Sequence, residues 1–286
     1  MAQRPYTLRM PDTRSTSVVF ASPHSGRNYA RTFLSASVLD EQSIRSSEDA
    51  FVDLLFEEAP LTGAPLLVAD TPRAFIDLNR SSEELDPALV EGVRHSQMNP
   101  RISSGLGVVP RVVANGRAIY RGKMTLAEAQ RRIDRHWRPY HDTLQALLDE
   151  AHALFDEAIL VDLHSMPHEA VQTVTGSMGR RPDVVLGDRF GSACSGAIVD
   201  MLEEAFVNAG LVVARNAPFA GAYITQRYGR PSRKQHAVQV EIDRALYMDE
   251  REICPNEGFD AFKALMSRAL YDIAEIGRPA LPLAAE

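Results

Sequence analysis

The alternation of short apolar segments with longer amphipathic segments constrains the fold of this chain more than any other sequence feature. The segment 158–163 is almost wholly apolar and predicts a buried central strand, and the amphipathic segment 140–155 before it predicts a helix. We expect further strands at 17–21, 65–69, 74–78, 183–187, 211–214 and 237–242, and further helices at 49–59, 125–137, 195–209 and 258–276. This pattern is typical of an α/β fold, in which helices cover both faces of a mostly parallel sheet.

Length and composition indicate a single globular domain spanning 1–286. Of the 286 residues, 45% are hydrophobic, and no linker-like change in composition divides the chain. The net charge of -7 argues against a nucleic-acid partner, and no apolar run is long enough for a membrane span. Cys194 and Cys254 lie far apart and no signal peptide is recognised, so we expect a cytoplasmic protein. The sequence indicates no oligomeric state.

Polar side chains follow several of the predicted strands at the point where each strand ends. Ligands of open α/β sheets bind beyond the carboxyl ends of the strands, so we expect these side chains at one edge of the sheet. They are His24 after 17–21, Asn79 and Arg80 after 74–78, His164 after 158–163, and Glu241 inside 237–242. The sequence therefore predicts one candidate site that contains two imidazoles, a guanidinium and a carboxylate.

Each of these residues also has a structural interpretation. A single histidine at a strand end is more often a hydrogen-bonded structural group than a metal ligand. When two such histidines occur, the structural and the metal-ligand interpretations are about equally favoured. The other six histidines lie in predicted helices or loops, where a structural or solvated role is favoured, although His141 could support the site. Arg80 could pair with any buried acidic group. Glu241 lies between Val240 and Ile242, and a carboxylate on an inward face needs a partner or a function.

A metal centre would account for both strand-end histidines. Catalytic zinc sites commonly use three protein ligands, often two imidazoles and one carboxylate, and keep a position for water. His24 and His164 supply the imidazoles, and the acidic segment expected beside His24 is Ser46-Ser-Glu-Asp49. We expect Asp49 to be the third ligand and Glu48 to be the alternative, because spacing alone does not distinguish them.

Such a centre predicts a hydrolytic reaction. Metal coordination lowers the pKa of the bound water, which becomes a nucleophile at neutral pH. A nearby carboxylate then acts as general base toward the water and as general acid toward the leaving amine, a role that suits Glu241. An arginine such as Arg73 would stabilise the developing oxyanion.

The motifs around these residues resemble those of the N-formylglutamate amidohydrolase family, and the resemblance covers about 17–250 in the family's order. It implies the fold of the zinc carboxypeptidase and aspartoacylase superfamily, a three-layer α/β sandwich with a mixed, mostly parallel central sheet and helices on both faces. The matching motifs are Val19-Phe-Ala-Ser-Pro-His-Ser-Gly26, Phe75-Ile-Asp-Leu-Asn-Arg80, Trp137-Arg-Pro-Tyr-His141, Val161-Asp-Leu-His-Ser165, Asn216-Ala-Pro-Phe-Ala-Gly221 and Gln239-Val-Glu241.

The resemblance also implies a ligand set for the metal. His24, His164 and Asp49 resemble the three protein ligands of one Zn²⁺ ion that also binds water, and other divalent metals remain possible. The superfamily's compact His-x-x-Glu ligand pair is absent, because Gly26-Arg27 follows His24. Glu48 therefore stays an alternative ligand.

Roles in substrate binding and catalysis follow from the same resemblance. Asn79 and Arg80 resemble a pair that binds the α-carboxylate of the substrate. Arg73 resembles the arginine that polarises the carbonyl group, and Glu241 resembles the catalytic glutamate. Further substrate contacts are expected from Asn216, Gly221, Tyr223 and Arg227.

The implied reaction is hydrolysis of an N-formyl or other N-acyl acidic amino acid, a small anion, with N-formyl-L-glutamate as the first candidate. The family also suggests a place in histidine degradation. A second carboxylate would need a second cation, for which the sequence offers the basic cluster Arg227, Arg230, Arg233 and Lys234.

Three alternatives remain open. A zinc deacylase or carboxypeptidase-like hydrolase could act on another N-acyl amino acid or a small peptide. A non-catalytic metal-binding or ligand-binding protein would use Glu241 only structurally. A serine hydrolase using Ser25 or Ser165 is disfavoured, because the sequence has no Gly-x-Ser-x-Gly motif.

Overall fold

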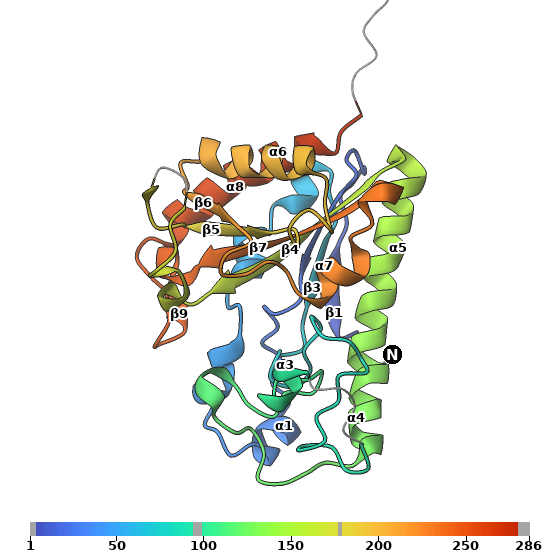
Figure 1. Cartoon of the computed structure of the whole chain (residues 1–286), viewed down its shortest axis with the longest axis vertical. Helices are drawn as coiled ribbons and strands as arrows, with labels where there is room; N and C mark the ends of the chain where they lie inside the picture. Colours follow the sequence, from blue (N-terminus) through green and yellow to red (C-terminus); the bar gives the residue numbers. More distant parts are fainter. Residues whose placement is uncertain (1–3, 94–98, 177–178, 280–286) are drawn as a thin grey trace, which may run out of the picture.

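The computed structural model describes residues 4–93, 99–176 and 179–279, and within these ranges one seven-stranded sheet forms the centre of the molecule (Figure 1). The order of its strands is β1-β3-β2-β4-β7-β5-β6. Their bounds are Tyr6–Arg9 for β1, Val18–Ser22 for β2, Leu66–Ala69 for β3, Ala158–Met166 for β4, Val184–Gly187 for β5, Val213–Arg215 for β6 and Gln235–Asp243 for β7.

The sheet is mixed and mostly parallel, as predicted. Strand β2 pairs in parallel with both β3 and β4, and β4 pairs in parallel with β7. Strand β1 is antiparallel to β3, while β5 and β6 are parallel to each other and antiparallel to β7. The carboxyl ends of β2, β4 and β7 therefore lie at one edge, which is where α/β sheets bind ligands.

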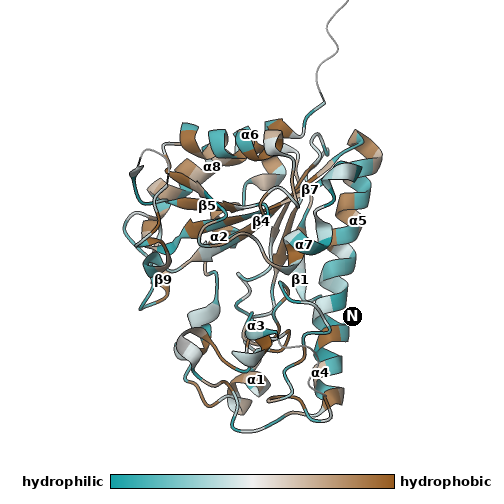
Figure 2. Ribbon diagram, in the orientation of Figure 1, coloured by the Kyte–Doolittle hydropathy of each residue, from teal (hydrophilic) through white to brown (hydrophobic). Residues whose placement is uncertain are grey.

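Helices cover both faces of this sheet (Figure 1). Alternate residues of β2 enter opposite cores: Val18 and Phe20 pack with one set of helices, and Val19 and Ala21 pack with the other. The first set comprises α2 (Val52–Leu55), α6 (Gly196–Asn208) and α8 (Phe259–Ile276), and the second comprises α4 (Leu126–Arg132), α5 (Arg138–Phe155) and α7 (Tyr223–Tyr228). Figure 2 shows the hydrophobic colour concentrated on the strands between these layers, so the three-layer prediction is confirmed.

Long connections after β2 and β3 form a loop-rich part of the molecule beyond the sheet edge, in the lower half of Figure 1. They contain α1 (Arg31–Ala36) and α3 (Pro100–Ser103) and are joined by a small core of their own, which includes Phe33, Ile44 and Ile119. The remaining short elements are η1 (Ser43–Ser47), η2 (Ala59–Thr62), η3 (Ala114–Gly116), η4 (Ile133–Trp137), η5 (His168–Val171), η7 (Pro231–Arg233), η8 (Arg244–Leu246), β8 (Met248–Asp249) and β9 (Cys254–Pro255).

Two predicted elements are wrong. The segment 74–78 is a series of turns rather than a strand, because its amide groups bond locally: the amides of Phe75 and Ile76 both donate to the carbonyl of Pro72. A short apolar run is compatible with either outcome. The helix predicted over 49–59 is reduced to α2, because the residue before it, Phe51, has a left-handed backbone with φ of 66°. Strand β1 was not predicted.

The expected break before Pro139 is also wrong, since α4, η4 and α5 follow one another without interruption. Pro139 lies in the first turn of α5, directly after the π-helical turn η4. A π turn shifts the hydrogen-bond pattern of the helix, so the missing proline N–H need not interrupt it. Within the described ranges, none of the helices combines the length and apolar character that a membrane crossing requires.

Candidate metal centre

A cavity of about 740 Å³ opens at the sheet edge where β4 and β7 end. Its floor is formed by side chains of these two strands, and its walls come from the long connections after β2 and β3 and from the segment 218–222. A volume of this size accommodates a small metabolite.

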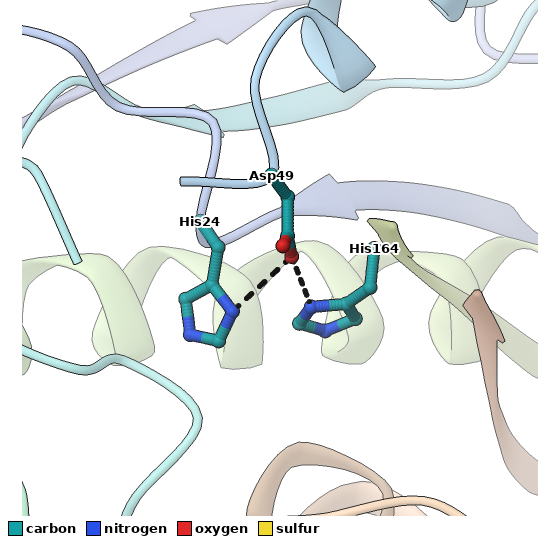
Figure 3. A group of neighbouring side chains, drawn as sticks. All are labelled: His24, Asp49 and His164. Carbon is teal, nitrogen blue, oxygen red and sulfur yellow. Dashed lines mark hydrogen bonds and ion pairs between the residues drawn. The ribbon is translucent and has the colours of Figure 1, made fainter. Parts of the chain in front are cut away.

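His24, Asp49 and His164 converge at the floor of this cavity (Figure 3). His24 follows β2, Asp49 follows η1, and His164 lies within β4. The Oδ2 atom of Asp49 is 2.9 Å from Nδ1 of His164 and 3.3 Å from Nδ1 of His24. All three residues are buried, and their candidate ligand atoms lie within 4.8 Å of one another.

A further carboxylate contacts the far side of each imidazole. Asp77 Oδ1 is 2.8 Å from Nε2 of His24, and Asp162 Oδ2 is 3.0 Å from Nε2 of His164. Histidine ligands of metals commonly donate their second ring N–H to a carboxylate in this way. When each Nε2–H is donated, the lone pair of each Nδ1 faces Asp49 Oδ2. For neutral imidazoles that arrangement is repulsive unless a cation, either a metal ion or a ring proton, lies between the three atoms.

The surroundings of His24 show that the donor set fits a zinc ion. Nδ1 of His24 is buried without a hydrogen-bond partner, which is unfavourable for a polar atom but suits an atom that binds a metal. Two ligand atoms of a tetrahedral zinc, each about 2.05 Å from the ion, lie about 3.3 Å apart. The separation of Nδ1 of His24 from Oδ2 of Asp49 is close to that value.

Arg244, which the sequence analysis did not identify, fixes the orientation of Asp49. Its Nη2 donates to Asp49 Oδ1 at 3.0 Å, and its Nε donates to Ser165 Oγ at 3.1 Å. Oδ1 is thus occupied, and Oδ2 is left for the two histidines. Burial alone would raise the pKa of Asp49, but His164 and His24 hold that pKa well below its ordinary value, so the carboxylate stays ionised.

The turn after β2 brings His24 into place. The amide of Asp49 donates to the carbonyl of His24 at 3.0 Å and so ties the two candidate ligands together through the backbone. Gly26 allows this turn to pack against the chain after β3, because a Cβ atom there would lie 2.2 Å from the carbonyl oxygen of Thr71.

Glu241 lies beside the candidate ligands on the neighbouring strand. It is the register partner of His164 across β4 and β7, and its carboxyl group is buried. Its Oε1 accepts a hydrogen bond of 2.6 Å from Nε2 of Gln239, two residues earlier on the same face of β7. Burial raises the pKa of Glu241 to about 7, although the charge of His164 opposes the rise.

Asn79, Arg80 and Arg73 also line the cavity, at the ends of the turns that replace the predicted strand. Asn79 is engaged on both sides of its amide. Its Oδ1 accepts from the amide of Ile224 at 2.8 Å, and its Nδ2 lies 3.3 Å from Nε2 of His164 and 3.4 Å from Gln239 Oε1. Nε of Arg80 donates to the carbonyl of Leu106, and Nε of Arg73 donates to Asp77 Oδ2.

The other predicted site residues differ in where they lie. Glu48 forms an ion pair of 3.0 Å with Arg45, so Asp49 rather than Glu48 joins the histidines. Asn216 donates to Asp188 and lies outside the cavity lining. Gly221 does line the cavity, with a φ of 104° that favours glycine.

Tyr223 and Arg227 bond to each other at 3.1 Å, and neither lines the cavity. The rest of the predicted basic cluster, Arg230, Arg233 and Lys234, immediately precedes β7. Since β7 starts at Gln235 and rises about 3.3 Å per residue, these residues lie about 20 Å from Glu241 at the opposite edge of the sheet. The structure does not bring this cluster to the site.

The fold and the site together define an α/β protein with a candidate metal centre at the base of a polar cavity. The chain belongs to the N-formylglutamate amidohydrolase family, whose sequence profile matches residues 16–248. This confirms the family predicted from the motifs.

Individual relatives agree with this assignment. The chain is 30% identical over 238 residues to an N-formylglutamate deformylase of Pseudomonas aeruginosa, covering 82% of this chain and 83% of the relative. A crystal structure of N-formylglutamate amidohydrolase from Ralstonia eutropha JMP134 superposes with a TM-score of 0.88 at 36% identity, over 96% of this chain and 99% of that one. A gene product of Agrobacterium tumefaciens, Atu2144, shares the fold with a TM-score of 0.64 at 17% identity, over 94% and 95% of the two chains.

Proposed function

We propose that the protein is a zinc-dependent amidohydrolase that converts N-formyl-L-glutamate to L-glutamate and formate. The convergence of His24, Asp49 and His164 beside the buried carboxyl group of Glu241 carries this proposal. The names of the relatives support the substrate. When bound by these three residues, a divalent metal supplies Lewis-acid activation of water and of the formyl oxygen.

Glu241 has the properties of the proton carrier. Its Oε1 is held by Gln239, which leaves Oε2 to accept a proton from the attacking water. The water oxygen bonds to the formyl carbon, the carbon–nitrogen bond breaks, and Glu241 delivers the proton to the leaving nitrogen. A carboxyl group whose pKa is raised to about 7 by burial can both accept and release a proton near neutral pH.

Arg73 is suited to stabilise the oxyanion that forms during this attack. Asp77 binds its Nε at 3.1 Å and also binds His24, so one carboxylate positions both a candidate ligand and the arginine. The remaining N–H groups of Arg73 are then available to a developing negative charge in the cavity.

Arg80 is suited to bind the α-carboxylate of the substrate. Its Nε is fixed by the carbonyl of Leu106, and the guanidinium can form two parallel hydrogen bonds to a carboxylate. Asn79 acts beside it as a positioning residue, because its amide joins α7 to β7. A single continuous sheet supports one catalytic domain within the chain.

A deacylation assay with controlled metal content tests the proposed function. The protein is stripped with a chelator, reloaded with Zn²⁺, and assayed on formyl, acetyl and succinyl derivatives of glutamate, aspartate and neutral amino acids. We expect hydrolysis to be lost on chelation, restored by zinc, and fastest for N-formyl-L-glutamate. Chelator-resistant hydrolysis would remove the metal from the proposal, and preference for another acyl group would favour the alternative deacylase.

A further inference from the structure

Among the residues that the structure describes, four arginines line the cavity, and they fall into two pairs with different surroundings. Arg73 and Arg244 are each neutralised by a carboxylate of the metal centre. Nε of Arg73 is 3.1 Å from Asp77, and Nη2 of Arg244 is 3.0 Å from Asp49. These two guanidinium groups therefore serve the built-in anions of the site.

Arg80 and Arg101 have a weaker carboxylate partner, Glu84, whose charge acts on both. The ion pair of Arg80 with Glu84 is long, at 3.9 Å, and its Nε binds a neutral carbonyl. Arg101 makes no ion pair with a carboxylate in the described ranges of the chain. Burial lowers the pKa of Arg80, Asp77 and Glu84 oppose this, and the charges of Arg101 and Arg73 lower that pKa further. Arg80 and Arg101 line the same cavity. Neighbouring cations of this kind are stabilised by a bound anion.

The loop that carries Arg101 is fixed against the residues around Arg80. The carbonyl of Arg101 accepts from the amide of Leu106 at 2.8 Å, and the carbonyl of Leu106 accepts from Nε of Arg80 at 2.9 Å. Asn99 caps α3 by accepting from the amide of Arg101, and its Nδ2 donates to Glu84. The side chain of Arg101 is exposed, but its backbone position relative to Arg80 is set by these contacts.

We propose that Arg101 binds the side-chain carboxylate of the substrate while Arg80 binds its α-carboxylate, so that the cavity selects N-acyl derivatives of dicarboxylic amino acids. This inference rests on the proposed function and assigns its specificity. Two guanidinium groups without a close carboxylate partner match the two carboxylates of such a substrate. The assignment replaces the basic cluster of the sequence analysis, because Arg230, Arg233 and Lys234 precede β7 at the other edge of the sheet and Arg227 lies outside the cavity lining.

A pair of substrates that differ only in this carboxylate provides the test. N-formyl-L-glutamate and N-formyl-L-glutamine are assayed with the wild-type enzyme, with Arg101→Gln and with Arg101→Lys. The control variant is Arg117→Gln, which removes an equal charge from an exposed position outside the cavity lining. For Arg101→Gln we expect kcat/KM on the glutamate substrate to fall about 10- to 100-fold, mainly through KM, and to change less than about 2-fold on the glutamine substrate. Arg101→Lys should retain part of the preference, and Arg117→Gln should retain all of it.

Specific outcomes would overturn this assignment. Equal losses on both substrates, or a wild-type enzyme that does not distinguish them, would show that Arg101 does not read the side-chain carboxylate. Thermal unfolding of each variant separates loss of binding from loss of structure. Failure of the zinc-loaded wild type to hydrolyse any formyl amino acid would instead contradict the proposed function. In that case the role of Arg101 is tested by calorimetry, which compares the affinity of glutarate for the zinc-loaded wild type and for zinc-loaded Arg101→Gln. Equal affinities would overturn the assignment.

Discussion

The two sides of the cavity are built differently. The sheet side, from β4 and β7, carries His164 and Glu241, and each is buried and hydrogen-bonded to a residue two positions earlier on its own strand. The loop side carries Arg80, whose ion pair with Glu84 is long at 3.9 Å, and Arg101, which is exposed. Under the proposed function, the sheet holds the reacting groups rigidly and the loops contact the variable part of the substrate.

The largest expected effect is on the sheet side, from His164→Ala. This variant should lose both stoichiometric zinc and activity, because only two protein ligands remain and Asp162 loses its partner. Metal analysis of the purified protein measures the first effect, and His152→Ala, at an exposed histidine, serves as the control. Zinc content equal to that of the wild type would contradict the metal-centre assignment.

Glu241→Gln should separate chemistry from metal binding. The amide retains the shape of the side chain but cannot accept the proton, so we expect kcat to fall about 100- to 10,000-fold. Zinc content and substrate affinity should stay near those of the wild type, because Glu241 is not among the candidate ligands. A near-normal turnover rate would exclude Glu241 as the proton carrier.

Arg244→Gln tests the support of the metal centre. Loss of its bond to Asp49 Oδ1 frees the carboxylate to rotate, and removal of such supporting contacts weakens metal affinity about 10- to 100-fold. Competition with a chromogenic chelator measures this affinity directly. Unchanged affinity in a variant that unfolds at the wild-type temperature would show that Arg244 does not orient the ligand.

Arg80→Lys is the matching change on the loop side. Lysine keeps the charge but not the two-pronged geometry, so KM should rise about 10-fold while zinc content stays constant. Steady-state kinetics on N-formyl-L-glutamate measures the effect. A change in kcat alone would place Arg80 with the reacting groups and weaken the contrast between the two sides.

The smallest expected effect concerns the pH dependence of stability and comes from His141, which lies outside the cavity lining. This buried imidazole bonds to the Leu78 carbonyl and to Tyr228, and burial lowers its pKa to about 3. The unfolded chain takes up a proton below about pH 6.5 while the folded protein does not, so this residue makes the protein less stable as the pH falls from 6.5 toward 3. At pH 5 the loss is about 2 kcal/mol.

Denaturant unfolding of metal-free wild type and His141→Gln at pH 7 and pH 5 measures this difference. The variant lacks the titrating group. Between pH 7 and pH 5, its free energy of unfolding should therefore fall by about 2 kcal/mol less than that of the wild type. Parallel losses in the two proteins would show that His141 is not held neutral.

The sequence predicts the sheet side of the site better than the loop side, for a physical reason. His24, His164 and Glu241 belong to or directly follow buried strands, and the edge at which parallel strands end is fixed by topology. Asp162 and Gln239 could have been found by the same logic, because residues two apart share a face of a strand.

Arg101 could not be predicted in this way. It lies more than 30 residues beyond β3, and its position depends on long-range contacts such as that between Leu106 and Arg80. The sequence also offered a basic cluster, and its members Arg230, Arg233 and Lys234 lie at the opposite edge, because closeness in sequence to a motif does not determine which edge of the sheet a residue reaches.

Strand β7 contains Gln239 and Glu241 and is followed directly by Arg244, so one segment supplies the proposed proton carrier, the residue that holds it and the contact that orients Asp49. Inserting or deleting one residue at the start of this strand would turn Gln239 and Glu241 toward the wrong layer and would displace Arg244. Length changes in the loop that bears Arg101 leave that alignment untouched. Divergence within this fold can therefore change which amides are cleaved by lengthening or shortening the loop while the hydrolytic apparatus is preserved.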